Sequence, residues 1–224
     1  MEINLDEDLL LSQRVDVNNQ QAIVSQVLRI AVYDEFKAYE TYTKIIEKFG
    51  AVHPFVNIKE AEALHYSVLI PLLQKYEVEV PLNDWDLKIE VPNTYIECCE
   101  IGVASEIENI AMYDNLIAHT NEEDVKDVLY RLQAASFNNH LPAFRQCVLN
   151  HYTLPAANQG FNPEGMMDKV NEYQELFQDL ASGNMDQGKI TELLTKLNVS
   201  MISGFALGGT SAAFLNNYIN KEEE

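Results

Sequence analysis

The sequence predicts an all-α protein whose main part is a four-helix bundle with one long crossover connection. Apolar positions recur at steps of three and four residues in four separate segments, which is the period of an amphipathic helix. The 224-residue chain is 47% hydrophobic, enough to bury a substantial core. The expected organisation is an N-terminal arm at 1–20, the bundle at 21–152, a linker at 153–165 and a C-terminal helical extension at 166–224.

The first predicted helix follows an apolar stripe over 27–49, and Gly50 then ends the pattern as a residue after a helix C-terminus commonly does. A second stripe covers 58–76. Only a short turn separates the two segments. We therefore expect them to form an antiparallel hairpin.

A second hairpin is predicted from the stripes at 96–117 and 125–147, which are also separated by a short polar turn. Pro142 lies inside the last segment. Because proline has no N–H and its ring presses on the carbonyl four residues earlier, at Asn138, we expect a kink beside His140.

The connection between the two hairpins, residues 77–93, contains Pro81 and Pro92 and has no helical period. About 15 extended residues at roughly 3.3 Å each span some 50 Å, which exceeds the roughly 36 Å of a 24-residue helix. The chain can therefore return to the end where it started. The second and third helices would then be parallel, joined by the crossover.

Each predicted stripe carries a polar residue of a metal-binding type near its middle. Each hairpin turn lies midway between the polar positions of its two helices, so all of them should meet in one layer of the core. In chain order these residues are Glu35, Glu62 with His65, Glu106 and His140.

Burying three carboxylates without a cation would cost several kcal/mol each or force them to take up protons. The predicted stripes carry no Lys or Arg that could neutralise them. Carboxylates and imidazoles together favour iron or manganese, and zinc could occupy such a site adventitiously. The alternative is a vestigial site in which protonated acids and tyrosines hydrogen-bond one another.

The segment Glu35-Phe-Lys-Ala-Tyr-Glu-Thr-Tyr42, followed by Glu62-Ala-Leu-His65, resembles the first half of rubrerythrin and related ferritin-like di-iron carboxylate proteins. The second half repeats it in part, since Glu106 precedes Tyr113 much as the first Glu precedes its Tyr. The resemblance covers roughly residues 22–150. Within this superfamily the stretches EKFG, NIKEAEALH and SFNNHLPAF are similar to an uncharacterised ferritin-like branch, a domain of unknown function.

The resemblance implies five metal ligands, with Tyr42 and Tyr113 hydrogen-bonded to the ligand carboxylates. One ligand is missing, because Phe137 stands where the pattern requires a Glu three residues before the second histidine. Gln133, one turn earlier, is a possible substitute. The site could hold two ions of unequal affinity, the weaker near Glu106 and His140, or a single ion, or none.

Three functions fit these expectations. The first is a di-iron or manganese oxidoreductase that activates oxygen or peroxide. The second is ferrous-iron oxidation and storage, and the third is a metal-free helical interaction module. The sequence contains no C-x-x-C pair that could form a rubredoxin-type electron-transfer domain.

The formal charge of −20 opposes binding to nucleic acid or to anionic membranes and favours metal cations as partners. The three cysteines, Cys98, Cys99 and Cys147, form no recognisable framework, and the N-terminus has no basic region of a secretory signal. We therefore expect a reducing, cytoplasmic location. The Gly-rich stretch 199–215 is too short and polar for a confident membrane span, and it could mediate homo-oligomer formation.

Overall fold

A computed structural model describes residues 4–153 of the chain, and the prediction of an all-α fold is confirmed for them, since this part contains no strand. None of its helices has the combination of length and apolar character needed to cross a membrane. The C-terminal extension and all but the first residue of the predicted linker lie outside the described residues. In chain order the elements are α1 (Glu7–Ser12), α2 (Ile23–Phe49), α3 (Phe55–Lys75), the 3-10 helix η1 (Trp85–Leu87), α4 (Tyr95–His119), α5 (Glu123–Ala135), the π-helix η2 (Ser136–His140) and α6 (Leu141–Thr153).

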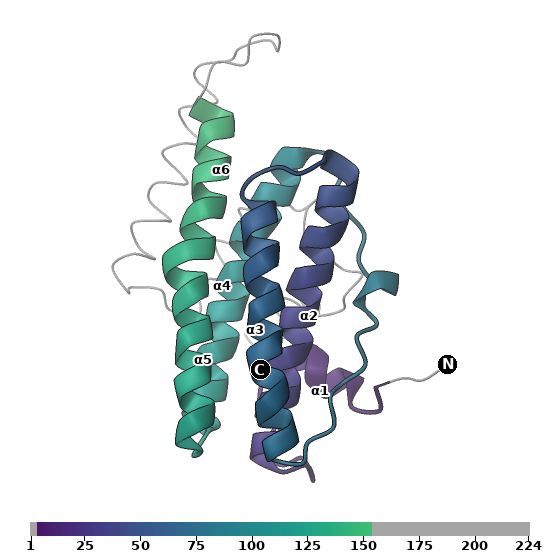
Figure 1. Cartoon of the computed structure of the whole chain (residues 1–224), viewed down its shortest axis with the longest axis vertical. Coiled ribbons are helices and arrows are strands. Elements are labelled where there is room, and N and C mark those ends of the chain that lie inside the picture. Colours follow the sequence, from purple (N-terminus) through teal and green to yellow (C-terminus); the bar gives the residue numbers. More distant parts are fainter. Residues whose placement is uncertain (1–3, 154–224) are drawn as a thin grey trace, which may run out of the picture.

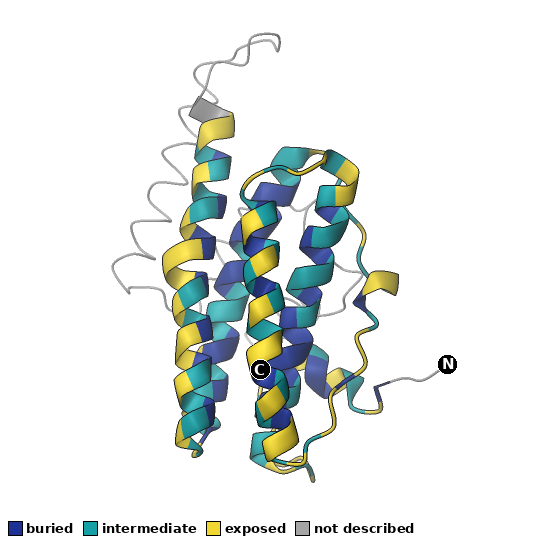
Figure 2. Ribbon diagram, in the orientation of Figure 1, coloured by how far each residue is buried: buried dark blue, intermediate teal, exposed yellow. Residues whose placement is uncertain are grey.

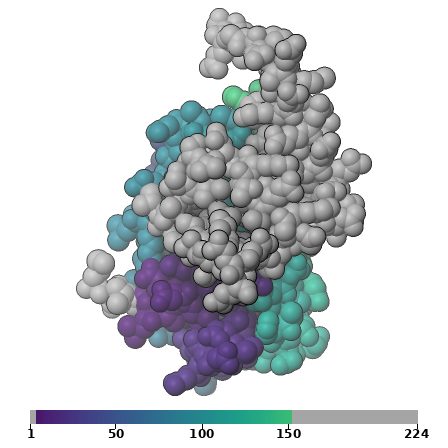
Figure 3. Space-filling view, turned by 180° about the vertical axis from the view of Figure 1, so that it is seen from behind, coloured from purple at the N-terminus to yellow at the C-terminus, as the bar shows by residue number. Residues whose placement is uncertain are grey.

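The longest helix, α2, packs along α3, and a short turn joins the two at the upper end of Figure 1. Gly50 caps α2 with a φ of 86°, a left-handed backbone angle that glycine adopts without strain. The predicted first helix and its end are therefore confirmed. The arm before it contains α1, whose Leu9 and Leu10 are buried against α2. From behind, the N-terminal residues form the purple surface at the lower end of the molecule (Figure 3).

The segment 76–94 leaves the lower end of α3 and reaches α4 at the upper end (Figure 1). Trp85 of η1 anchors this segment, because its ring is buried and its Nε1 donates a hydrogen bond to the carbonyl of Tyr33 at 2.9 Å. Thr94 and Glu97 then form a capping box at the start of α4. A long polar connection is thus attached to α2 before the next helix begins.

The last predicted helix consists of three consecutive elements, because the π-helix η2 lies between α5 and α6. Where we expected a kink beside His140, the structure has one wide π-helical turn. Pro142 follows two residues later and offers no N–H to the preceding turn, which is a recognised cause of an irregular helical ladder. The extra residue in this turn changes which side chains face the core.

Two apolar clusters make up the core, one towards each end of the helices. One contains Tyr33, Leu69, Tyr113 and Leu132, and the other Tyr42, Ile58, Val103 and Leu141, among further residues. Figure 2 shows that the buried positions of the long helices face one another. On each long helix the polar residues of the predicted site lie between members of the two clusters, so a polar layer separates two dry regions.

The expectation that the three cysteines form no pair was wrong. Cys99 of α4 and Cys147 of α6 form a disulfide with a Cα–Cα distance of 6.0 Å. No motif marks this pair, since 48 residues separate its members and only the packing of α4 on α6 brings them together. Cys98, the free cysteine of the described residues, is buried.

Candidate metal centre

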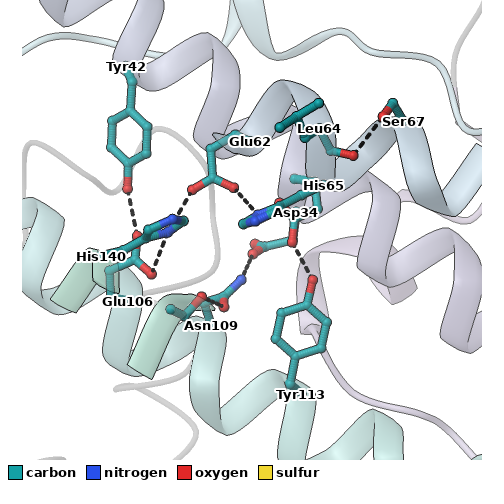
Figure 4. Close-up of polar contacts among 12 residues, drawn as sticks. Asp34, Tyr42, Glu62, Leu64, His65, Ser67, Glu106, Asn109, Tyr113 and His140 are labelled. Carbon is teal, nitrogen blue, oxygen red and sulfur yellow. Dashed lines mark hydrogen bonds and ion pairs between the residues drawn. The ribbon is translucent and has the colours of Figure 1, made fainter. Parts of the chain in front are cut away.

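Glu62 on α3 lies at the middle of the polar layer and contacts two histidines. Its Oε2 is 2.8 Å from His65 Nδ1, and its Oε1 is 3.2 Å from His140 Nδ1 (Figure 4). The first contact follows from the helix itself, because residues three positions apart share a face. The second joins α3 to the π-helix η2. One carboxylate is therefore shared by the two imidazoles.

Each imidazole is also close to a second carboxylate. Glu35 Oε2 from α2 lies 3.2 Å from His65 Nδ1, and Glu106 Oε2 from α4 lies 3.6 Å from His140 Nδ1. Two groups of three potential ligands result, and within each group one atom of every residue lies within 4.8 Å of the others. The groups are Glu35, Glu62 and His65, and Glu62, Glu106 and His140. The structure thus brings together all five residues proposed from the sequence.

His140 Nδ1 is buried but has no hydrogen-bond partner in the described part of the chain. It is close to two carboxylates, yet neither contact has the geometry of a hydrogen bond. A buried polar nitrogen without a partner is costly and calls for an explanation. A cation held between this nitrogen and the neighbouring carboxylates would supply one.

Two buried tyrosines hold the outer carboxylates in place. Tyr42 donates a hydrogen bond to Glu106 Oε1 at 3.0 Å (Figure 4), and Tyr113 donates one to Glu35 Oε1. Both contacts are those expected from the sequence. Such hydrogen bonds fix the orientation of a carboxylate and leave its other oxygen directed at the site.

The electrostatics of the layer favour charged histidines. Burial opposes a charge on His65, but the hydrogen bonds and charges of Glu35 and Glu62 outweigh it and raise the pKa of His65 to about 10. Burial opposes the charge on His140 as well, and the close contacts and charges of Glu106 and Glu62 likewise raise the pKa of His140 to about 10. Without a cation, two imidazolium groups balance most of the carboxylate charge.

The carboxylates respond differently to the same layer. Burial and the charge of Glu62 raise the pKa of Glu35 to about 7. Burial also acts to raise the pKa of Glu62, but the close contacts of His140 and His65 outweigh it and lower that pKa. The shared carboxylate of Glu62 is therefore held in its ionised form more firmly than that of Glu35, as a bridging metal ligand must be.

Two details of the predicted site were wrong. Phe137 is 43% exposed and so does not occupy an inward position, whereas Ser136 beside it is only 4% exposed. The π-helix explains this change, because in a wide turn the residue four positions before His140, and not three, shares its face. Gln133 does not reach the centre either, since its side chain donates to the carbonyl of Ile110 and to Asp114 Oδ1.

Sequence reasoning missed a polar chain beside the centre. Ser136 donates to Asn109 Oδ1 at 2.7 Å, and Asn109 Nδ2 donates to Asp34 Oδ2 at 2.8 Å. Asp34 accepts a further hydrogen bond, at 2.6 Å, from Gln13 after α1. One available signal was the spacing, because Asn109 follows Glu106 by three residues and therefore shares its helix face.

Comparisons with known proteins bear on the fold alone. No family model matches the chain, and no curated protein matches it. The chain is similar to the crystal structure of hypothetical protein MJ0754 from Methanococcus jannaschii DSM 2661, with a TM-score of 0.53 and 21% sequence identity. The match covers 70% of this chain and 97% of that one. At this identity the likeness supports a related helical fold and says nothing about activity.

Proposed function

We propose that the protein binds two metal ions in a ferritin-like four-helix bundle and uses them as a di-iron or dimanganese oxidoreductase acting on oxygen or peroxide. The bundle would consist of α2, α3, α4 and the run α5–η2–α6, with residues 76–94 as its long crossover. The order of the elements and the resemblance of the α2 and α3 motifs to rubrerythrin support this interpretation.

The observation that carries the proposal is the position of Glu62 between two imidazoles, one of which has a buried nitrogen that makes no hydrogen bond within the described residues. Glu62 would bridge the ions. Glu35 with His65 would complete one ligand set, and Glu106 with His140 the other. Three protein ligands to each ion leave positions open for an oxidant, which is the requirement for a catalytic rather than a purely structural site.

The protein's own residues would prepare this chemistry in defined ways. Tyr42 and Tyr113 orient the terminal carboxylates, and the two apolar clusters exclude water from both sides of the layer. When bound, low-valent iron or manganese supplies electrons and open positions for oxygen or peroxide. The histidines must lose a proton to bind an ion, so binding releases protons.

The test is a calorimetric titration of ferrous or manganous ion into protein stripped of metal, combined with metal analysis of protein purified without chelator. We expect about two ions per chain for the parent. Replacing Glu62 by Gln keeps the size of the side chain but removes its charge, and should abolish tight binding of both ions. Glu60→Gln is the matched control, because Glu60 lies on the same helix but is exposed. A parent that binds no ion would refute the proposal.

A second candidate has its own supporting observation. The raised histidine pKa values indicate that charged imidazoles and carboxylates could satisfy one another without any cation. The metal-free interaction module therefore stays a candidate, and an absence of metal binding would favour it. Iron storage would instead predict a large closed assembly, which the mass of the protein in solution would reveal.

A further inference from the structure

The Cys99–Cys147 disulfide lies on the same two helices as one half of the proposed centre. Cys99 stands seven residues before Glu106 on α4, and Cys147 stands seven residues after His140 at the end of η2. Seven residues are close to two helical turns, so each cysteine lies near the face of the corresponding ligand and roughly 10 Å along the axis. The disulfide and the Glu106–His140 pair therefore both lie between α4 and the η2–α6 run, about two helical turns apart.

The interface between these two pairs is tightly packed. Phe144 of α6 lies against Gly102 of α4 so closely that a Cβ on Gly102 would come within 2.4 Å of the Phe144 ring. The two helices consequently approach each other between the disulfide and the ligands. Phe144 belongs to the same apolar cluster as Cys99.

A column of aromatic rings joins the two pairs. Tyr42, which donates to Glu106, has its ring centroid 5.5 Å from that of Phe144 and 5.8 Å from that of Phe55. Phe55 lies 5.8 Å from the ring of Tyr95, and Tyr95 Oη lies 3.4 Å from Cys147 Sγ. A series of aromatic contacts therefore connects the carboxylate layer with the sulfur pair, and it provides a medium for electron transfer over this distance.

We propose that Cys99 and Cys147 act as a reversible dithiol that supplies two electrons to the metal centre for the reduction of a peroxide. This inference rests on the proposed function and names its reductant. The two thiols lose two electrons and two protons and form the S–S bond. The peroxide gains them, its O–O bond breaks, and hydrogen peroxide yields two waters.

The different burial of the two cysteines fits a disulfide that is reduced again by an external dithiol. Cys99 is fully buried, whereas Cys147 is partly exposed, so Cys147 is the member of the pair that an external dithiol would attack to regenerate both thiols by exchange. Cys98 is buried, and burial raises the pKa of its thiol to about 12, which keeps it in the unreactive protonated form. The third cysteine is therefore a natural control.

The experiment counts thiols and peroxide under anaerobic conditions. Reduced protein, with and without ferrous ion, is treated with hydrogen peroxide, and free thiols are then measured after denaturation. We expect the loaded parent to lose two of its three thiols at least about tenfold faster than the metal-free parent. It should also consume about one more equivalent of peroxide than the same loaded chain with its disulfide already formed.

Two variants sharpen the test. Cys147→Ser cannot form the disulfide, so it should not lose a pair of thiols, and it should consume as little peroxide as the loaded parent that starts with its disulfide formed. Cys98→Ser should behave as the parent does. Because that disulfide-bonded parent carries no mutation, the comparison holds even if Cys147→Ser folds poorly. Equal rates of thiol loss with and without metal would overturn the inference and leave metal binding intact. Failure of the parent to bind metal in the calorimetric titration would instead refute the proposed function itself.

Discussion

At the residue scale, the two histidines divide the candidate centre into halves, because each belongs to one ligand group while Glu62 belongs to both. His140→Ala should therefore cost about one ion per chain and leave the ion of Glu35 and His65 in place. His65→Ala should do the converse. Calorimetric stoichiometry checks both variants, with Glu60→Gln as the unaffected control. Complete loss of binding by either single variant would show that the two ions bind only as a unit.

The polar chain beside the centre makes a stability prediction that does not depend on metal. Asn109→Ala would leave buried Asp34 without one donor and Ser136 without its acceptor. We expect a loss of about 1–3 kcal/mol in the free energy of unfolding, measured by urea denaturation of metal-free protein. Asn138→Ala is the control, since exposed Asn138 bonds only the carbonyl of Ala134 among the contacts of the described chain and should change stability by about 0.5 kcal/mol or less. Equal losses from both variants would contradict a specific role for the chain.

Single residues could be predicted where local spacing dictates geometry. Glu62 and His65 had to share a face because three residues separate them on a helix, and this needed no knowledge of the fold. The meeting of His140 and Glu62 in one layer was also predicted, from the midpoint positions of the hairpin turns, but their direct contact was not. The Cys99–Cys147 bond and the contact of Gln13 with Asp34 were not, because they depend on how distant segments pack.

At the element scale, η2 decides which residues of the last helical run face the centre. A regular α-helix would turn position 137 inward, but the wide turn exposes Phe137 and buries Ser136. Phe137→Glu should therefore leave metal stoichiometry and affinity unchanged within about twofold, as calorimetry would show. A gain of about tenfold or more would mean that position 137 reaches the centre after all.

The four amphipathic segments were predictable as helices because their apolar periods are long and regular. The π-turn was harder to foresee, although the sequence contains a sign of it. Leu132, Ser136 and His140 are all buried and succeed one another at steps of four, which drifts around a regular α-helix but suits a wider turn. Pro142 indicated that the ladder would be disturbed, but not the kind of disturbance.

At the scale of the whole molecule, the polar layer lies between two apolar clusters, so its charges are removed from water on both sides. Such a layer is costly unless its members neutralise one another or hold a cation. The molecule therefore has two ways to balance the same carboxylates. Protons on the imidazoles do so in the metal-free protein, and metal ions would replace those protons on binding.

This competition predicts how stability depends on pH. Folding raises the pKa of His65 and His140 from 6.5 to about 10 and that of Glu35 from 4.5 to about 7. The folded metal-free protein thus binds more protons than the unfolded chain between about pH 4.5 and 10, and its stability must fall as pH rises through this window. The lowered pKa of Glu62 acts in the opposite sense, but only in more acidic solution.

We therefore expect metal-free protein to melt several degrees lower at about pH 9 than at about pH 6, because the unfolded chain releases its two imidazole protons near pH 6.5 while the folded protein still holds them. Metal-loaded protein should show a smaller decline, since its ions remain when the protons leave, so the difference in melting temperature between the two forms should widen with pH. Thermal unfolding with and without chelator measures both curves.

His140→Gln should flatten the metal-free curve by removing one of the two titrating imidazoles. A metal-free melting temperature that stays constant from about pH 6 to 9 would mean that the histidines are neutral in the folded protein, and that the carboxylates are balanced in some other way.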